Sequence, residues 1–269
     1  MNRLLLALRK KISGVNKMES LLNYRIDSLS EQLTRLARET EVSRAHLDSL
    51  FRDYLPSRIH ESFDVRFMAR VEVGLSSARF FNAHLYDKQI FESDLELLQS
   101  LAPNVRPQDL VLEFGVFSGR TINALAESLP HHALWGFDSF EGLPETWRSD
   151  FSQGTFKVDA LPTVRENVNL MKGLFDKTLP AFLEKTPGEV GFVHIDCDLY
   201  SSTKTVLGLL KDRLRDEALL VFDEYFNYPG WEQHEYKAFS EFIDQSSFKF
   251  EYLGCNPRHQ QVAVMLLRR

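Results

Sequence analysis

The stretch from Leu110 to Thr121, which reads LVLEFGVFSGRT, constrains the fold of this chain more than any other. Its first residues, up to Phe114, are apolar and favour a strand, and the run that begins at Thr121 has helical character. Two glycines, Gly115 and Gly119, lie between them. Glycine lacks a Cβ and tolerates positive φ, so backbone N–H groups at such a junction can come close to a ligand. The stretch therefore predicts a strand, a ligand-binding turn and a helix.

Glu113, near the end of this expected strand, indicates what kind of ligand the turn could bind. Glu113 precedes the turn, and the glycine spacing is Gly-x-x-x-Gly rather than the Gly-x-Gly-x-x-Gly of dinucleotide-binding folds. A carboxylate beside the ligand suits a cationic or hydroxyl-bearing molecule better than a pyrophosphate. Taken alone, the motif also fits an ordinary turn in any α/β protein.

The composition excludes several classes of function. The chain of 269 residues has a formal net charge of -6, whereas nucleic-acid-binding domains usually carry a basic stripe. No apolar run approaches the roughly 20 residues of a transmembrane helix, and the apolar stretch after Met1 is too short for a secretory signal. Cys197 and Cys255 show neither metal-ligand spacing nor a disulfide framework. We therefore expect a cytoplasmic protein with no nucleic acid as its partner and no transmembrane segment.

The N-terminal region carries a heptad-like pattern. Apolar residues alternate spacings of four and three, pause at Thr40 and Ser43, and then resume; they are Leu22, Ile26, Leu29, Leu33, Leu36, Leu47 and Leu50. We interpret residues 1–55 as a long helix, a coiled coil that pairs with a copy of itself to give a homo-oligomer or with another protein. The alternative is a solvated helix laid against the rest of the chain.

A helical region and an α/β domain follow. Residues 56–104 are rich in Phe and Arg and predict helices that could cover a ligand cleft as a lid. Pro103 and Pro107 mark the start of the α/β domain, residues 105–269.

Strands and helices alternate through this last region, which predicts a parallel sheet. After the first strand, four more are expected at 133–137, 168–172, 191–195 and 218–222. Two close-set strands at 248–253 and 261–267 then add an antiparallel hairpin. The fold class expected is α/β, with a mostly parallel sheet.

Acidic residues stand at the carboxyl ends of several expected strands, which in such sheets meet at one edge, where ligands bind. They are Glu113, Asp138, Asp196 and Asp223. Asp138 lies about twenty residues beyond the glycine turn, a position suited to accepting hydrogen bonds from ribose hydroxyls. A cap or turn residue is the alternative role for Asp138.

Three of the acids predict a metal site. Asp196, Asp223 and Glu224 would bring like charges together with no Lys or Arg nearby in sequence, an arrangement that raises pKa values or recruits a cation. Oxygen ligands favour Mg²⁺ or Mn²⁺. Asp198 is either a fourth ligand or a helix cap, and we favour the cap. The alternative for the whole cluster is a set of exposed acids at loop starts.

Five motifs, in this order, carry a family resemblance: LEFGVFSGRT (112–121), GFDSFEGLP (136–144), KGLFDKTLP (172–180), HIDCDLYSST (194–203) and FDEYF (222–226). Together they resemble the macrocin O-methyltransferase (TylF-type) family of class I S-adenosylmethionine-dependent, metal-dependent enzymes that methylate sugars and natural products. The resemblance covers residues 105–269. It implies a Rossmann-like sheet of seven strands, to which this chain adds the long N-terminal helix.

The resemblance also implies roles for individual residues. The residues implied to hold S-adenosylmethionine are Glu113, Gly115, Ser118, Thr121, Asp138 and Ser139. Mg²⁺ would be bound by Asp196, Asp223 and Glu224, where the family often has Asp in place of Glu224. The contact with the adenine, for which we see no clear acid after the third strand, is left unassigned.

A mechanism follows as a hypothesis. The metal would orient a hydroxyl of a small-molecule or glycan acceptor toward the methyl group, and Asp196 or His234 would take the proton. His194 lies within a buried strand and is assigned a structural role, whereas Trp231 could stack on a sugar ring. Two alternatives remain open: a nicotinamide-dependent oxidoreductase, and a non-catalytic coiled-coil scaffold whose α/β domain binds a ligand.

Overall fold

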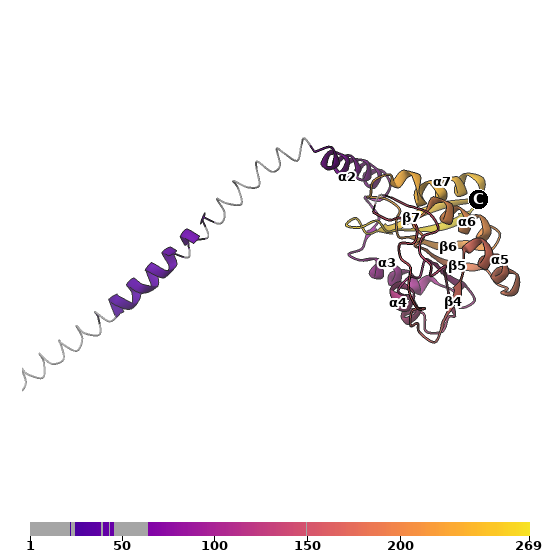
Figure 1. The fold of residues 1–269 in the computed structure, drawn as a ribbon, viewed down its shortest axis with the longest axis horizontal. Helices are drawn as coiled ribbons and strands as arrows, with labels where there is room; N and C mark the ends of the chain where they lie inside the picture. The colour runs from indigo at the N-terminus through magenta and orange to yellow at the C-terminus, as the bar shows by residue number, and fades with distance from the viewer. Residues whose placement is uncertain (1–21, 23–24, 39, 43, 46–63, 149) are drawn as a thin grey trace, which may run out of the picture. The chain divides into compact units, whose positions relative to one another are not determined.

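The computed structural model describes residues 22, 25–38, 40–42, 44–45, 64–148 and 150–269 (Figure 1). The chain divides into two compact units, Met1–Met68 and Ala69–Arg269. No helix in the described part of the chain has the length and apolar character needed to cross a membrane.

In the first unit, the described residues between 22 and 45 are helical. The apolar stripe predicted from the heptads lies on this helix, and each of its five members there is between 55% and 67% exposed: Leu22, Ile26, Leu29, Leu33 and Leu36. Leu47 and Leu50 lie outside the described residues. The stripe is thus an apolar surface within a polar helix, and its pairing stays a prediction.

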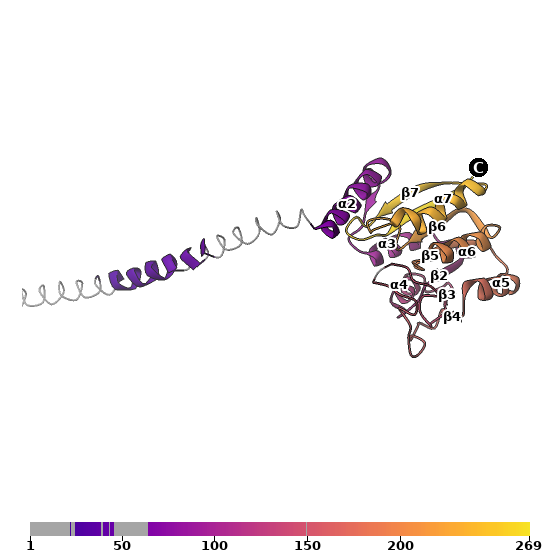
Figure 2. The same cartoon turned by 45° about the horizontal axis from the view of Figure 1, so that its top comes forward.

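The second unit is built on an eight-stranded sheet in the order β1-β7-β8-β6-β5-β2-β3-β4 (Figures 1 and 2). The strands are β1 (Gln89–Ile90), β2 (Leu110–Phe114), β3 (Leu134–Asp138), β4 (Val168–Lys172), β5 (Val190–Ile195), β6 (Leu214–Phe222), β7 (Phe248–Cys255) and β8 (Val262–Arg268). All neighbouring strands are parallel except for β8, which is antiparallel to both β6 and β7. The predicted α/β class, mostly parallel sheet and antiparallel hairpin are confirmed.

The expected number of seven strands is wrong, because a short eighth strand lies at the edge. β1 pairs in parallel with β7, with Gln89 opposite Gly254. A Cβ on Gly254 would lie 2.5 Å from the carbonyl oxygen of Gln89, so the glycine permits this close approach. β1 belongs to the region 56–104, for which we expected only helices.

Helices cover both faces of the sheet (Figure 2). They are α2 (Val65–His84), α3 (Asp94–Leu101), α4 (Arg120–Ser128), α5 (Phe175–Lys185), α6 (Tyr200–Leu210) and α7 (Glu235–Gln245), with short 3-10 turns η1 (Ala102–Asn104) and η2 (Trp231–Gln233). Successive side chains along β2 point to opposite faces of the sheet. Val111 belongs to the apolar cluster of α3 and α4, whereas Leu112 and Phe114 belong to that of α5, α6 and α7.

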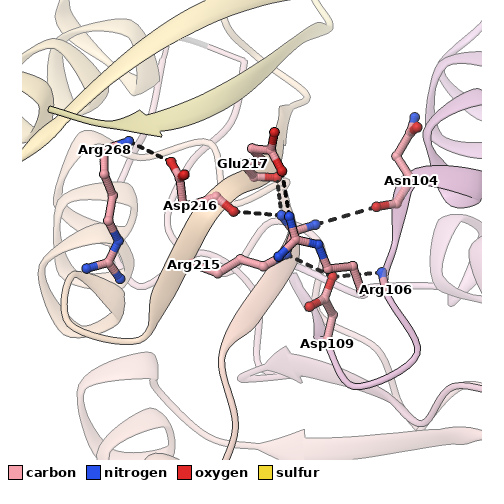
Figure 3. Close-up of polar contacts among 7 residues, drawn as sticks. All are labelled: Asn104, Arg106, Asp109, Arg215, Asp216, Glu217 and Arg268. Atoms are coloured by element: carbon pink, nitrogen blue, oxygen red, sulfur yellow. Dashed lines mark hydrogen bonds and ion pairs between the residues drawn. The ribbon is translucent and has the colours of Figure 1, made fainter.

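A buried ion pair ties the amino-terminal ends of the strands together (Figure 3). The Nε of Arg215, on β6, donates to Oδ2 of Asp109, just before β2, at 2.9 Å, and the two side chains are 3% and 1% exposed. The same carboxylate oxygen accepts the N–H of Arg106 at 2.8 Å. Gly191 lies against this pair, because a Cβ there would fall 2.1 Å from the Asp109 carboxylate. Strands β2 and β6, which flank β5, are thereby held at the end opposite the acidic residues.

Candidate active site

A cavity of about 400 Å³ lies at the carboxyl ends of the strands. One residue at or just after the end of each of five neighbouring strands lines it: Gly115, Asp138, Gly173, Asp196 and Glu224. This is the edge at which ligands bind in parallel α/β sheets. The rest of the lining comes from the glycine turn, the loops after β3 and β5, and the N-terminal parts of α5 and α6.

The glycine turn lies against the loop after β5. Gly115 has a φ of +91°, and a Cβ there would lie 1.6 Å from the carbonyl oxygen of Asp196. Glycine is therefore required at this position both by the backbone conformation and by the close approach of the next strand. The turn contributes Gly115 and Phe117 to the cavity lining.

Asp138 fastens this turn. One of its carboxylate oxygens accepts the N–H groups of Val116 and Phe117, at 2.9 and 2.8 Å, and the other accepts that of Phe140 at 2.7 Å. The carboxylate also lines the cavity, as does the neighbouring Ser139. Asp138 thus has the turn-forming role that we weighed as an alternative, and its contact with a ribose stays a prediction.

The other residues expected near the cofactor lie outside the cavity lining. Glu113 is only 1% exposed: one carboxylate oxygen accepts the Thr121 hydroxyl, and the other lies 3.0 Å from Nδ1 of His194. Glu113 and Thr121 therefore bond to each other and not to the cavity space, and their contact with the cofactor stays a prediction. Ser118 is exposed on the glycine turn.

Three carboxylates, those of Asp196, Asp198 and Glu224, line one end of the cavity, which we call its acidic end. Burial, followed by the charges of Asp223 and Asp198, raises the pKa of Asp196 well above its usual value. Burial and the charge of Asp223 raise the pKa of Asp198 to about 7. Burial likewise raises the pKa of Glu224 and of Glu235. Buried negative charges this close together repel one another, so the cluster can be stabilised by a bound proton or a metal ion.

The ligand atoms that come closest together include a histidine. One atom from each of His194, Asp196 and Asp223 lies within 4.8 Å of the other two. Nε2 of His194 is buried without a hydrogen-bond partner, 4.0 Å from Oδ1 of Asp223. Oε2 of Glu224 is also buried and unpartnered. Asp196 and Asp223 could therefore hold a metal ion with either of these residues as the third ligand.

His194 is held in position by its other ring nitrogen. Burial opposes a positive charge on the ring, but the hydrogen bond to Glu113 and the charges of Glu113 and Asp223 outweigh it, so its pKa is raised. A carboxylate partner of this kind orients metal-binding histidines in proteins. We assigned His194 to a structural role, because in the sequence a polar residue within an apolar strand gives no sign of which group its ring will face.

Glu235 is a buried acid that the sequence analysis missed. It is the first residue of α7, is fully buried, and accepts the N–H of Glu224 at 3.1 Å. Its other carboxylate oxygen is buried without a partner. An acid at the start of a helix is ordinarily exposed to solvent and stabilised by the helix dipole. Its position in the sequence therefore did not indicate that Glu235 is buried at the site.

The remaining candidates lie around this acidic end. His234 does not line the cavity; it is half-buried, and burial, followed by the charge of Arg148, lowers its pKa. Trp231 is packed against Phe80 and is buried, so its ring has a packing role and does not face a sugar. Asp198 lines the cavity, and no side chain caps α6, so the cap favoured for Asp198 is wrong too.

Comparisons with known proteins agree with this geometry. Residues 112–225 match a family model described as a methyltransferase domain. A crystal structure of CalS11, a calicheamicin methyltransferase, shares 24% sequence identity over 65% of this chain and 76% of that chain, with a TM-score of 0.51. The O-methyltransferase NovP gives 18% identity over 65% and 79% of the two chains and a TM-score of 0.47. The O-methyltransferase TomG from Streptomyces achromogenes gives 18% identity over 74% and 89%, with a TM-score of 0.45. No curated protein matches the chain by sequence.

The family-model match spans the glycine turn and the acids at the ends of β3, β5 and β6, so this segment is similar to a methyltransferase domain. The likeness to CalS11 shows that the sheet has the Rossmann-like fold of class I methyltransferases.

Proposed function

We propose that this protein transfers a methyl group from S-adenosylmethionine to a hydroxyl oxygen of a sugar, a glycan or another natural product. The observation that carries the proposal is the placement of a carboxylate cluster at one end of a 400 Å³ cavity, inside a segment that matches a methyltransferase domain. A general base and an oxygen-rich cation site each promote methylation of a weakly acidic hydroxyl.

For the cofactor, we propose the side of the cavity formed by the glycine turn. Gly115, Ser118, Asp138 and Ser139 would contact S-adenosylmethionine directly. Glu113 and Thr121, which lie beneath the turn, would act by supporting it.

For the metal, we propose Asp196 and Asp223 as ligands, with Glu224 or His194 as the third. The buried, unpartnered donor atoms of these last two residues fit a divalent cation. Three carboxylates suit Mg²⁺, whereas a set that contains an imidazole suits Mn²⁺ better. A bound divalent cation acts as a Lewis acid that lowers the pKa of an acceptor hydroxyl.

The proton needs an acceptor among the residues of the chain. The hydroxyl oxygen attacks the methyl carbon, the bond from that carbon to the sulfonium sulfur breaks, and S-adenosylhomocysteine leaves as a neutral thioether. We assign the released proton to Asp196, whose side chain lies at the end of β5 in the cavity. His234 is the rival base, because its lowered pKa leaves it neutral near pH 7.

Calorimetric titration with S-adenosylhomocysteine, with Mg²⁺ and again with EDTA, tests the cofactor assignment. We expect micromolar-range binding, about -8 kcal/mol, to wild-type protein. Asp138→Ala should weaken it at least about tenfold, or 1.4 kcal/mol, because it frees the N–H groups of the glycine turn.

Asp212→Ala, at an exposed site after α6, is the control and should bind as the wild type does. Folded wild-type protein that binds no S-adenosylhomocysteine would refute the proposal. Quenching of nicotinamide fluorescence by the same protein would then support the oxidoreductase alternative.

We also propose that residues 1–55 form a coiled coil with a second copy of the chain, that 56–104 cover the cavity, and that 105–269 are the catalytic domain. The exposed apolar stripe supports the first of these. Burial of an Ile or Leu side chain contributes about 1.5 to 3 kcal/mol, so a paired stripe would hold two chains together.

Substitution of the stripe tests this pairing. We expect light scattering to report an oligomer for the wild type and a monomer for Ile26→Ser with Leu33→Ser, because both residues belong to the exposed stripe. Asp27→Ser with Thr34→Ser changes the next residue along the same helix in each case and should stay oligomeric. A monomeric wild type at micromolar concentration, or an oligomeric stripe variant, would contradict the pairing.

A further inference from the structure

A small aromatic group holds an arginine beside the acidic end of the cavity. The Arg148 guanidinium lies 3.8 Å from the ring centroid of Trp147, 4.7 Å from that of Phe151 and 5.1 Å from that of Tyr228. The N–H of Phe151 donates to the carbonyl oxygen of Arg148 at 2.8 Å, and the N–H of Trp147 donates to the carbonyl oxygen of Phe151 at 3.0 Å. Stacking of this kind holds the flat guanidinium in place.

Two buried donors in this group have no acceptor. Nε of Arg148 and Nε1 of Trp147 are both buried without a hydrogen-bond partner, and Trp147 is only 8% exposed. Arg148 also makes no ion pair with any residue in the part of the chain that the structure describes. Buried donors are costly to leave unpaired, so two of them side by side point to an acceptor that comes from outside the chain.

The group adjoins the proposed catalytic residues. The Tyr228 hydroxyl donates to the carbonyl oxygen of Glu224 at 3.2 Å, and the rings of Trp147 and His234 are 6.2 Å apart. Leu143 and Pro144, a few residues earlier in the same loop, line the cavity. Arg148 and Trp147 do not themselves line the cavity, so an anion held by them would lie beside its acidic end.

Neutralisation of the acidic cluster is a weaker explanation for this arginine. The charge of Arg148 lowers the pKa of Asp198, yet burial and Asp223 still hold that pKa at about 7. None of the described carboxylate oxygens lies within ion-pair distance of the guanidinium. Arg148 is thus stacked on aromatic rings, with several carboxylates nearby that it does not pair with.

We propose that Arg148 and Trp147 bind an anionic group of the methyl acceptor, a carboxylate or a phosphate carried by a sugar. Guanidinium binds both groups through paired, charge-assisted hydrogen bonds, and the indole N–H adds a third donor. The identification of this ligand as the acceptor rests on the proposed function, whereas the binding of an anion does not.

Titration with three sugars tests the inference. Protein loaded with S-adenosylhomocysteine is titrated with D-glucuronate, D-glucose 6-phosphate and methyl α-D-glucopyranoside, and binding is followed by NMR saturation transfer and calorimetry. We expect wild-type protein to bind at least one of the anionic sugars about tenfold or more tightly than the neutral one. Glucuronate and glucose 6-phosphate distinguish a carboxylate from a phosphate as the preferred anion.

The variants separate a binding role from a structural one. Arg148→Gln should abolish the preference for the anionic sugar, Arg148→Lys should keep part of it, and Trp147→Phe, which keeps the ring but not the N–H, should weaken it. Arg165→Gln, which removes an exposed arginine paired with Glu127, is the matched control and should keep it.

Equal binding of neutral and anionic sugars by the wild type, or a preference that survives in Arg148→Gln, would overturn the inference. S-adenosylhomocysteine binding is measured first in the same samples. Its absence would refute the proposed function, and the comparison of the sugars with unloaded protein would still decide whether Arg148 binds an anion.

Discussion

Replacement of Asp196 by Asn is expected to abolish methyl transfer while leaving cofactor binding nearly intact. The side chain lies at the end of β5 in the cavity, and burial with the charges of Asp223 and Asp198 raises its pKa. Asn has almost the same shape but can neither take the proton nor give a metal ion a charged ligand. Loss of a general base alone costs about 10²- to 10⁴-fold in rate, and loss of a metal ligand adds to this.

Release of S-adenosylhomocysteine in the presence of a panel of vicinal-diol sugars measures turnover, and the acceptor that the wild type methylates best is used for the variant. Binding of S-adenosylhomocysteine to Asp196→Asn should stay within about threefold of wild type, a difference below 1 kcal/mol. Asp212→Asn, at an exposed turn, is the control and should keep full activity.

Mn²⁺ binding, followed by electron paramagnetic resonance, gives a readout independent of turnover. We expect Asp196→Asn and Asp223→Asn each to weaken it at least about tenfold, or 1.4 kcal/mol. His194→Gln and Glu224→Gln, compared in the same titration, show which residue is the third ligand. Full turnover and unchanged Mn²⁺ binding in Asp196→Asn would remove this residue from both roles.

The sheet and its functional edge could be predicted because each depends on a local pattern. A short apolar run followed by an acid recurs at Asp138, Asp196 and Asp223, and the carboxyl ends of parallel strands meet at one edge. The structure places all three residues there, in or beside one cavity. The strand β1 escaped prediction because two residues carry no periodicity, and only Gly254 opposite them allows the pairing.

The contacts within the site depend on partners that are distant in the sequence, and local patterns do not reveal them. Glu113 faces His194, 81 residues away, rather than the cavity. Asp138 is bound to N–H groups of a turn more than twenty residues earlier, and Glu235 reaches back to Glu224. Whether a strand-end acid meets a ligand or the protein itself is decided by tertiary packing, so the sequence could predict the edge but not the contacts of each acid.

Substitution of Asp109 by Asn should produce the largest loss of stability outside the site. It would leave the Arg215 guanidinium buried and uncompensated at the amino-terminal ends of β2 and β6 (Figure 3). Removal of one partner of a buried ion pair typically lowers the free energy of unfolding by about 3 to 5 kcal/mol. The effect should appear as a lower urea midpoint with an unchanged m-value.

Two further variants distinguish the contribution of this buried pair to stability from that of the surface charges around it. Glu217→Gln breaks the neighbouring ion pair with Arg106, whose two side chains are 44% and 53% exposed, and should cost no more than about 1 kcal/mol. Asp109→Leu with Arg215→Met removes both buried charges and should be more stable than Asp109→Asn, since an apolar pair has no charge to leave unpaired. A loss below about 1 kcal/mol in Asp109→Asn, or a double variant as unstable as the single one, would show that the pair does not hold β2 and β6 in place. If it does hold them, Asp109→Asn should also bind S-adenosylhomocysteine less well, because the cavity lies at the carboxyl ends of β2 and β6.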